Sequence, residues 1–317
     1  MNTRRRPLIP CSVPASRTLL AGATALGVFG LSACGGGTAA SGDGDGVRVV
    51  ASFYPMQFLA EEIGGEHVSV SVLTRPGVEP HDLELKPRQA AELDEADLVV
   101  YLKGLQPSVD RAVEQSGAAN IAEATSYTGL DPYGGHGHGD HDHGPDDPHV
   151  WLDPVRYSEV AEGVGKALAK ADPEHAADYR KNAGELVSKL NALDADFREG
   201  LKNRRTDTFI TTHAAFGYLA GRYGLHEEAI TGLNPSAEPS GARMRQLHRV
   251  AEKDGVDTVF FEASASDRTA RALADDLGLR TDVLDPLEGV TEKSRGDDYF
   301  EIMRANLRAL QKALGAQ

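Results

Sequence analysis

The sequence predicts an α/β fold with two similar lobes, each built on a four-stranded, mainly parallel sheet flanked by helices and joined by a long spine helix. Three observations indicate this. Short apolar runs alternate with helical patterns, as is typical of a parallel sheet covered on both faces. The apolar runs fall into two sets of four, and a long amphipathic segment separates the sets. The 317 residues are enough for two domains of ordinary size.

The first 33 residues differ from the rest of the chain. An arginine-rich start leads into the apolar run "TLLAGATALGVFGLSA", which ends in small residues. This pattern indicates a secretory signal peptide over residues 1–33; a retained membrane anchor is the alternative, but the run is short for a membrane span.

The end of this run, "LSAC", resembles the lipobox of bacterial lipoproteins. The resemblance implies cleavage before Cys34 and a lipid on its thiol. Residues 34–46 then form the lipidated cysteine and a flexible tether, because "GGGTAASGDGDG" has no side chains that could build a core. Acyl chains would hold the protein at a membrane.

The composition restricts the chemistry. Cys11 and Cys34 are the two cysteines; the first leaves with the signal peptide and the second becomes the anchor. A metal site in the exported domain must therefore use histidines and carboxylates. The net charge of −15 excludes nucleic acid as a partner.

Eight apolar runs are the expected strands, and they divide the chain into its lobes. The first lobe, 47–171, has expected strands at 47–54, 68–74, 97–102 and 119–124. The second lobe, 204–317, has expected strands at 208–212, 227–231, 257–263 and 281–286.

Residues 172–203 form the predicted linking helix. Asp172 is its expected N-cap and Pro173 suits its first turn. Apolar residues then recur every three or four positions, which produces one apolar stripe. About 30 residues at 1.5 Å each make a rod of roughly 45 Å. Gly184 interrupts the stripe, so two helices with a turn there are the alternative.

Polar groups follow several of the expected strands. His81 comes after the second strand, His213 ends the first strand of the second lobe, and Asp285 ends its last strand. Ligands of open α/β sheets bind outside the carboxyl ends of the strands. His149 lies in the segment before a helix of the first lobe. Three imidazoles and a carboxylate would suit Zn²⁺, although no local spacing selects these four residues.

Over nearly its whole exported length the chain resembles the zinc and manganese solute-binding proteins of bacterial ABC importers (cluster A-I, ZnuA-type). The resemblance depends on "ASFYPMQFLAEEIGG", "GVEPHDLELKP", "DPHVWLDP", "THAAFGYLAGRYGL", "AEPSGARMRQL", "DTVFFEASAS" and "VLDPLEG". It implies two lobes joined by a long helix, with one metal ion in the cleft between them. Matching positions imply the ligands His81, His149, His213 and Asp285.

The resemblance also bears on which metal is bound. Manganese members typically have Glu at the third position, where this chain has His213, and this difference favours zinc. Some zinc members use a Glu directly before the first histidine, where this chain has Pro80. The fourth ligand is therefore Asp285 or a water. Glu262, at the end of an expected strand, could orient a ligand histidine.

A second histidine group lies in a predicted loop over residues 133–148. Glycine and aspartate separate its four members, which has no helical or strand period. Zinc members of the family commonly have such a loop, and we expect a weaker, accessory zinc site there. Its residues are His136, His138, His141 and His143.

The predicted function is high-affinity capture of extracytoplasmic Zn²⁺, without catalysis, and its delivery to an ABC permease and its ATPase. The protein is expected to be a monomer, anchored through Cys34 on the outer face of the cytoplasmic membrane. Alternatives are a manganese importer component, a zinc-dependent hydrolase, and an adhesin or zinc buffer. Against a hydrolase, the chain has no HExxH motif and no GxSxG with a plausible nucleophile elbow.

Overall fold

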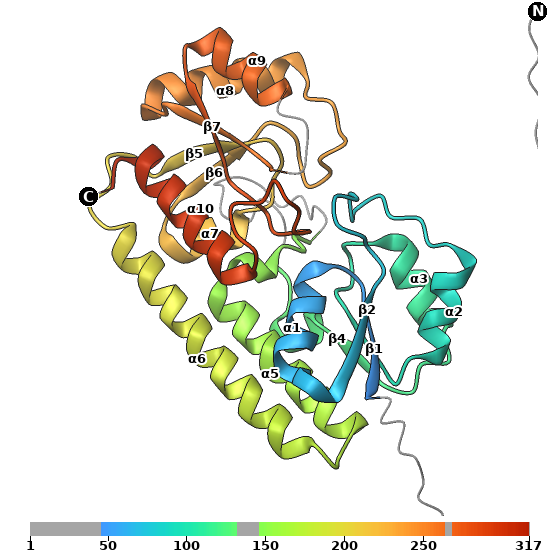
Figure 1. Cartoon of the computed structure of the whole chain (residues 1–317). Helices are drawn as coiled ribbons and strands as arrows, with labels where there is room; N and C mark the ends of the chain where they lie inside the picture. The colour runs from blue at the N-terminus through green and yellow to red at the C-terminus, as the bar shows by residue number, and fades with distance from the viewer. Residues whose placement is uncertain (1–45, 132–145, 264–267, 317) are drawn as a thin grey trace, which may run out of the picture. The chain divides into compact units, whose positions relative to one another are not determined.

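The computed structural model describes residues 46–131, 146–263 and 268–316, which contain two four-stranded parallel sheets (Figure 1). The predicted signal peptide, the lipid site at Cys34 and most of the tether lie outside the described residues. The first sheet has the order β2-β1-β3-β4 and the second the order β6-β5-β7-β8. The two lobes repeat one topology, and the predicted fold class is confirmed.

The strands of the first sheet are β1 (Val47–Ala51), β2 (Val68–Val72), β3 (Leu98–Tyr101) and β4 (Ile121–Glu123). Those of the second sheet are β5 (Thr208–Thr211), β6 (His226–Ala229), β7 (Thr258–Phe261) and β8 (Arg280–Val283). Strands β3 and β5, inside their sheets, are buried along their whole length, whereas edge strand β2 is partly exposed throughout. Continuous apolar runs are expected of parallel strands covered on both faces.

The helices connecting the strands have recognisable starts and ends. Proline lies in the first turn of α1, α2, α3 and α5, where its missing N–H costs nothing. Left-handed glycines close α7, α8 and α10. The first lobe has α1 (Tyr54–Gly64), α2 (Pro87–Glu95), α3 (Pro107–Gln115), α4 (Thr125–Thr128) and α5 (Pro154–Ala171). The second has α7 (Gly217–Tyr223), α8 (Gly241–Asp254), α9 (Arg268–Leu277) and α10 (Tyr299–Leu314). None of the helices in the described parts of the chain has the length and hydrophobicity needed to cross a membrane.

The linking helix is α6 (Ala176–Gly200), which is continuous through Gly184 and contacts both α1 and α10. The predicted N-cap at Asp172 is wrong. The Asp172 N–H donates to Leu168 O and closes α5. Its carboxylate is occupied by His175 Nδ1 at 2.6 Å and by the Tyr179 hydroxyl at 2.7 Å. Helix α6 therefore starts after His175, one turn later than expected.

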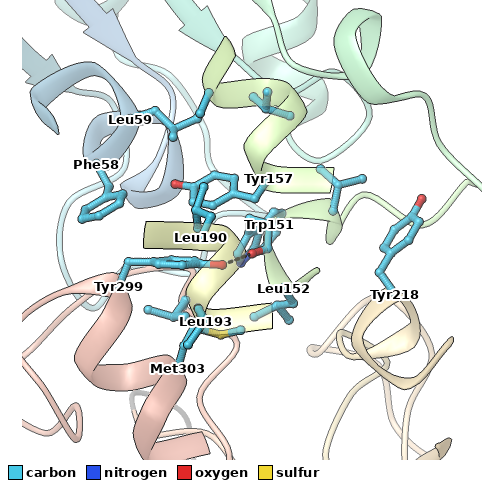
Figure 2. Packing of buried hydrophobic residues seen from close by; sticks show 14 of the residues in the cluster. Phe58, Leu59, Trp151, Leu152, Tyr157, Leu190, Leu193, Tyr218, Tyr299 and Met303 are labelled. Atoms are coloured by element: carbon cyan, nitrogen blue, oxygen red, sulfur yellow. Dashed lines mark hydrogen bonds between the residues drawn. The ribbon is translucent and has the colours of Figure 1, made fainter. Parts of the chain in front are cut away.

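One apolar cluster is shared by the two lobes and by α6, and Figure 2 shows part of it. Trp151, in the short 3-10 helix Val150–Leu152, is one of its fully buried members. The Trp151 indole N–H donates to Pro286 O at 2.7 Å, and the Tyr299 hydroxyl donates to Trp151 O at 2.7 Å. These two buried hydrogen bonds join a first-lobe segment to two second-lobe segments close to His149, whose ring centroid lies 5.1 Å from that of Trp151.

We expect Tyr299→Phe to lower the free energy of unfolding by about 1–3 kcal/mol, because the buried Trp151 carbonyl would lose its partner. Urea unfolding of the metal-stripped protein measures the loss. Tyr101→Phe is the control, since the Tyr101 side chain is buried but its hydroxyl makes no hydrogen bond to the described residues. Equal losses of unfolding free energy in the two variants would contradict the contribution assigned to the hydrogen bond between Tyr299 and Trp151.

Candidate metal centre

His81 lies in the loop that follows β2, and its turn is held from inside the first lobe. The side chain of Gln106, fully buried, donates to Pro80 O at 3.2 Å and to the Thr74 hydroxyl at 2.8 Å. The His81 N–H donates to Glu79 Oε1 at 3.1 Å. The imidazole is 11% exposed, so His81 is the most accessible histidine of the site.

His149 is completely buried just before Trp151. Both its backbone N–H and its ring Nδ1–H donate to Asp147 Oδ1, at 3.0 and 2.7 Å. Because Asp147 occupies Nδ1, the imidazole presents Nε2 to the interior of the site.

His213 follows β5 and is oriented in the same way from another strand. Its Nδ1–H donates to Glu262 Oε1 at 2.6 Å, and Thr212 Oγ1 donates to the same oxygen at 3.0 Å. Glu262 follows β7, beside β5 in the sheet, and is 4% exposed. This contact is the one anticipated for Glu262. No sequence pattern had pointed to Asp147 as the corresponding residue for His149.

Glu288 completes the group. Its Oε1 lies 3.3 Å from the Nε2 of His81, 3.3 Å from that of His149 and 3.4 Å from that of His213. One donor atom from each of the four residues lies within 4.8 Å of the others. The Nε2 atoms of His149 and His213 are buried and have no hydrogen-bond partner among the described residues. Unsatisfied buried nitrogens are rare, and a metal ion would satisfy both.

The structure brings together three of the four implied ligands, but its carboxylate is Glu288, not Asp285. Asp285 Oδ1 accepts the Leu287 N–H at 2.9 Å and so closes a tight turn in which Leu287 has φ +60°. The Asp285 N–H also donates to Asn306 Oδ1, and the Asn306 side-chain amide donates to Asp285 O. Asp285 therefore shapes the turn, and Glu288, three residues later and with a longer side chain, reaches the histidines.

When no cation is bound, the negative charges of the carboxylates favour the protonated forms of the histidines in the site. Burial alone would lower the pKa of His149, but the hydrogen bond to Asp147 and the negative charges of Asp147 and Glu288 raise it to about 9. The pKa of His213 is raised well above its usual value because Glu262 and Glu288 outweigh burial. The three histidines hold the pKa of Glu288 far below its usual range despite its burial. A metal ion entering the site must therefore displace protons.

Three imidazole nitrogens and one carboxylate form a donor set suited to Zn²⁺ in a tetrahedral shell. His81 and His149 come from the first lobe, and His213 and Glu288 from the second. A relative displacement of the lobes would divide the donors two and two. The predicted accessory histidines His136, His138, His141 and His143 lie outside the described residues.

This fold, with one four-donor site between two topologically equivalent lobes, defines the class of metal solute-binding proteins. The chain belongs to the family described as ZnuA, zinc-uptake complex component A, periplasmic, which it matches over residues 49–313.

Two relatives and one solved structure illustrate the similarity. The high-affinity zinc uptake system protein ZnuA of Bacillus subtilis is 36% identical over 302 residues, covering 90% of this chain and 93% of that protein. The zinc-binding lipoprotein AdcA of Streptococcus pneumoniae is 36% identical over 84% of this chain. The chain spans about half of AdcA, 55% of its length. The structure of Zn(II)-bound AdcA has a TM-score of 0.73 at 34% identity, over 86% of this chain and 58% of that one.

Proposed function

We propose that this protein captures Zn²⁺ outside the cytoplasm and delivers it to the permease of an ABC importer driven by an ATPase. The observation that supports this most strongly is the convergence of His81, His149, His213 and Glu288, with two buried Nε2 atoms that make no hydrogen bond within the described residues. The names of its relatives point to the same cargo. The predicted lipid on Cys34 would hold the protein on the outer face of the cytoplasmic membrane.

The donor set favours zinc over manganese. Imidazole nitrogens match Zn²⁺, whereas Mn²⁺ prefers carboxylate, carbonyl and water oxygens. Three of the four donors are imidazoles. We therefore expect Zn²⁺ to bind much more tightly than Mn²⁺, with manganese occupying the site only when zinc is removed.

A binding role fits the site better than a catalytic one. Four protein donors would complete a tetrahedral shell and leave no open position for a reacting water, which catalytic zinc sites retain. The donors also belong to two lobes, so moving one lobe could release the ion. Capture and release are the functions we infer, and the protein is not an enzyme in this proposal.

Zinc uptake by cells tests the transport role. A strain lacking the gene should take up less ⁶⁵Zn²⁺ in zinc-poor medium and should recover with the wild-type gene, but not with His213→Ala. His226→Ala, an exposed histidine outside the metal group, is the matched control and should restore uptake. Undiminished uptake in the strain without the gene would contradict the transport role. Restoration of uptake by the His213→Ala gene would contradict the assignment of His213 to the zinc site.

Zinc affinity should rise with pH between about 6.5 and 9. The raised pKa of His149 means that its proton stabilises the metal-free fold below about pH 6.5. That contribution is lost as pH rises through about 9, while zinc requires the neutral ring. Calorimetry at pH 6.5 and 8.5, in two buffers with different ionisation enthalpies, measures the affinity and the protons released. Equal affinities at both pH values with no proton release would contradict this.

The accessory loop remains a prediction. His136, His138, His141 and His143 would bind additional Zn²⁺ weakly and with exposed ligands, and removal of residues 136–143 should abolish only weak binding events.

A further inference from the structure

The hydroxyl of Tyr218 joins two backbone positions of the first lobe. Tyr218 lies on α7 of the second lobe and is 5% exposed (Figure 2). Its oxygen accepts the Asp131 N–H at 2.8 Å and its hydrogen is donated to Asp147 O at 2.8 Å. The Asp147 N–H also donates to Asp131 O at 3.0 Å. One second-lobe side chain therefore fixes the residue that orients His149.

The carboxylate of Asp147 is contacted from both lobes as well. Oδ1 accepts both hydrogen bonds from His149. A Cβ built on Gly217 would lie only 2.7 Å from Asp147 Oδ2, so only glycine lets α7 approach the carboxylate this closely. The first turn of α7 therefore packs closely against the Asp147 carboxylate, and the Tyr218 hydroxyl binds the Asp147 carbonyl, both from the second lobe. His149 binds the same carboxylate from the first lobe.

Contacts of the Tyr218 ring do not depend on its hydroxyl. The Arg156 guanidinium lies 4.6 Å from the ring centroid. Arg156 also donates to the carbonyls of Thr128 and Gly129, at 3.3 Å each, and pairs with the Asp131 carboxylate. Phenylalanine at position 218 would keep the packing and the cation–π contact, so Tyr218→Phe removes the two hydrogen bonds selectively.

We infer that Tyr218 is a positioning residue for the zinc site: it transmits the relative position of the lobes, through Asp147, to the orientation of His149. This rests on the proposed function. When α7 moves away from the first lobe, Asp147 loses its anchor and the His149 ring loses its fixed orientation. Separation of the lobes would withdraw the two donors of the second lobe, His213 and Glu288. It would also weaken zinc binding by His149, a ligand of the first lobe.

The experiment compares Tyr218→Phe with Tyr223→Phe. Tyr223 is on the same helix, and its hydroxyl donates to Asp194 at 3.2 Å, away from the metal group. Zinc release into excess chelator, followed by the fluorescence of Trp151, the sole tryptophan, gives the dissociation rate. Tyr218→Phe should release zinc about tenfold faster, the lower end of the effect expected for an outer partner of a metal ligand, and Tyr223→Phe at the wild-type rate.

A spectroscopic signature distinguishes positioning from general weakening. In Co²⁺-loaded protein, the ring N–H protons of ligand histidines give shifted, exchangeable proton resonances. The His149 Nδ1–H should exchange faster with solvent in Tyr218→Phe, while the His213 Nδ1–H, bound to Glu262, should not change. Unchanged exchange at His149, or equal acceleration at both histidines, would overturn the inference.

A double-mutant cycle with Asp147→Ala tests the inference by a second route, because alanine removes the oxygen that orients His149 and keeps the carbonyl bound by Tyr218. Because Tyr218 acts through the Asp147 side chain, adding Tyr218→Phe to Asp147→Ala should change the release rate less than twofold. Full additivity would overturn the inference. Failure of the wild-type protein to bind Zn²⁺ at all would contradict the proposed function instead, so the two failures are distinguishable.

Discussion

Replacing His213 with alanine is expected to abolish tight zinc binding. Outer partners of metal ligands typically contribute 10–100-fold to affinity, so removing a ligand itself should cost more than about a hundredfold. His213 is buried, and its Nε2 makes no hydrogen bond in the part of the chain that the structure describes, so no neighbouring group would replace this ligand without rearrangement. Competition against a chelator of known affinity measures the change.

Two controls make this result specific. His226→Ala removes an exposed imidazole outside the metal group and should leave the affinity unchanged. Thermal unfolding of metal-free His213→Ala should remain cooperative, which excludes loss of binding through misfolding. Tight binding by a folded His213→Ala protein would show that the cation is bound elsewhere.

Glu288→Gln should also weaken zinc binding by more than about a hundredfold, whereas Asp285→Asn should weaken it by less than about tenfold. Glu288 Oε1 faces all three ligand nitrogens, and the amide would remove the negative charge. Asparagine at 285 retains an oxygen that can accept the Leu287 N–H, so the turn should survive. The same chelator competition gives both affinities.

The pair of variants decides which carboxylate is the fourth ligand. In metal-free Glu288→Gln the pKa of His149 should also fall, because one of the two carboxylates that raise it is gone. NMR titration of the His149 ring checks this independently of zinc. If Asp285→Asn caused the larger loss of affinity, the ligand set would have to be revised.

Most of the fold could be predicted because each parallel strand is a continuous apolar run between helical patterns. Every expected strand is present, although the strands are shorter than their apolar runs. For example, β1 ends at Ala51, where the expected run continued to 54. The predicted helix start at Asp172 is wrong because Asp followed by Pro has the same local signature whether the Asp begins a helix or ends one. Here it closes α5.

The site was less predictable than the fold. Histidines at strand ends pointed to His81 and His213, but the choice between Asp285 and Glu288 depends on a turn that no periodicity reveals. Leu287 has φ +60°, an unusual conformation for a residue with a branched side chain, and the turn makes Glu288 the carboxylate that faces the histidines.

The orienting residue Asp147 is only two positions before His149, so an Asp-x-His spacing could have suggested it. The partnership with Tyr218 could not have been foreseen, because 71 residues separate Asp147 from Tyr218 and only the packing of the two lobes brings them together.

The measurement that tests the central claim most directly is a calorimetric titration of metal-stripped protein lacking residues 136–143 with Zn²⁺. The account predicts one tight binding event per chain, retained in this variant and lost when His213→Ala is added, with the weaker events of the full-length protein absent. If all zinc binding disappeared with residues 136–143, the cluster of His81, His149, His213 and Glu288 would not be the zinc site.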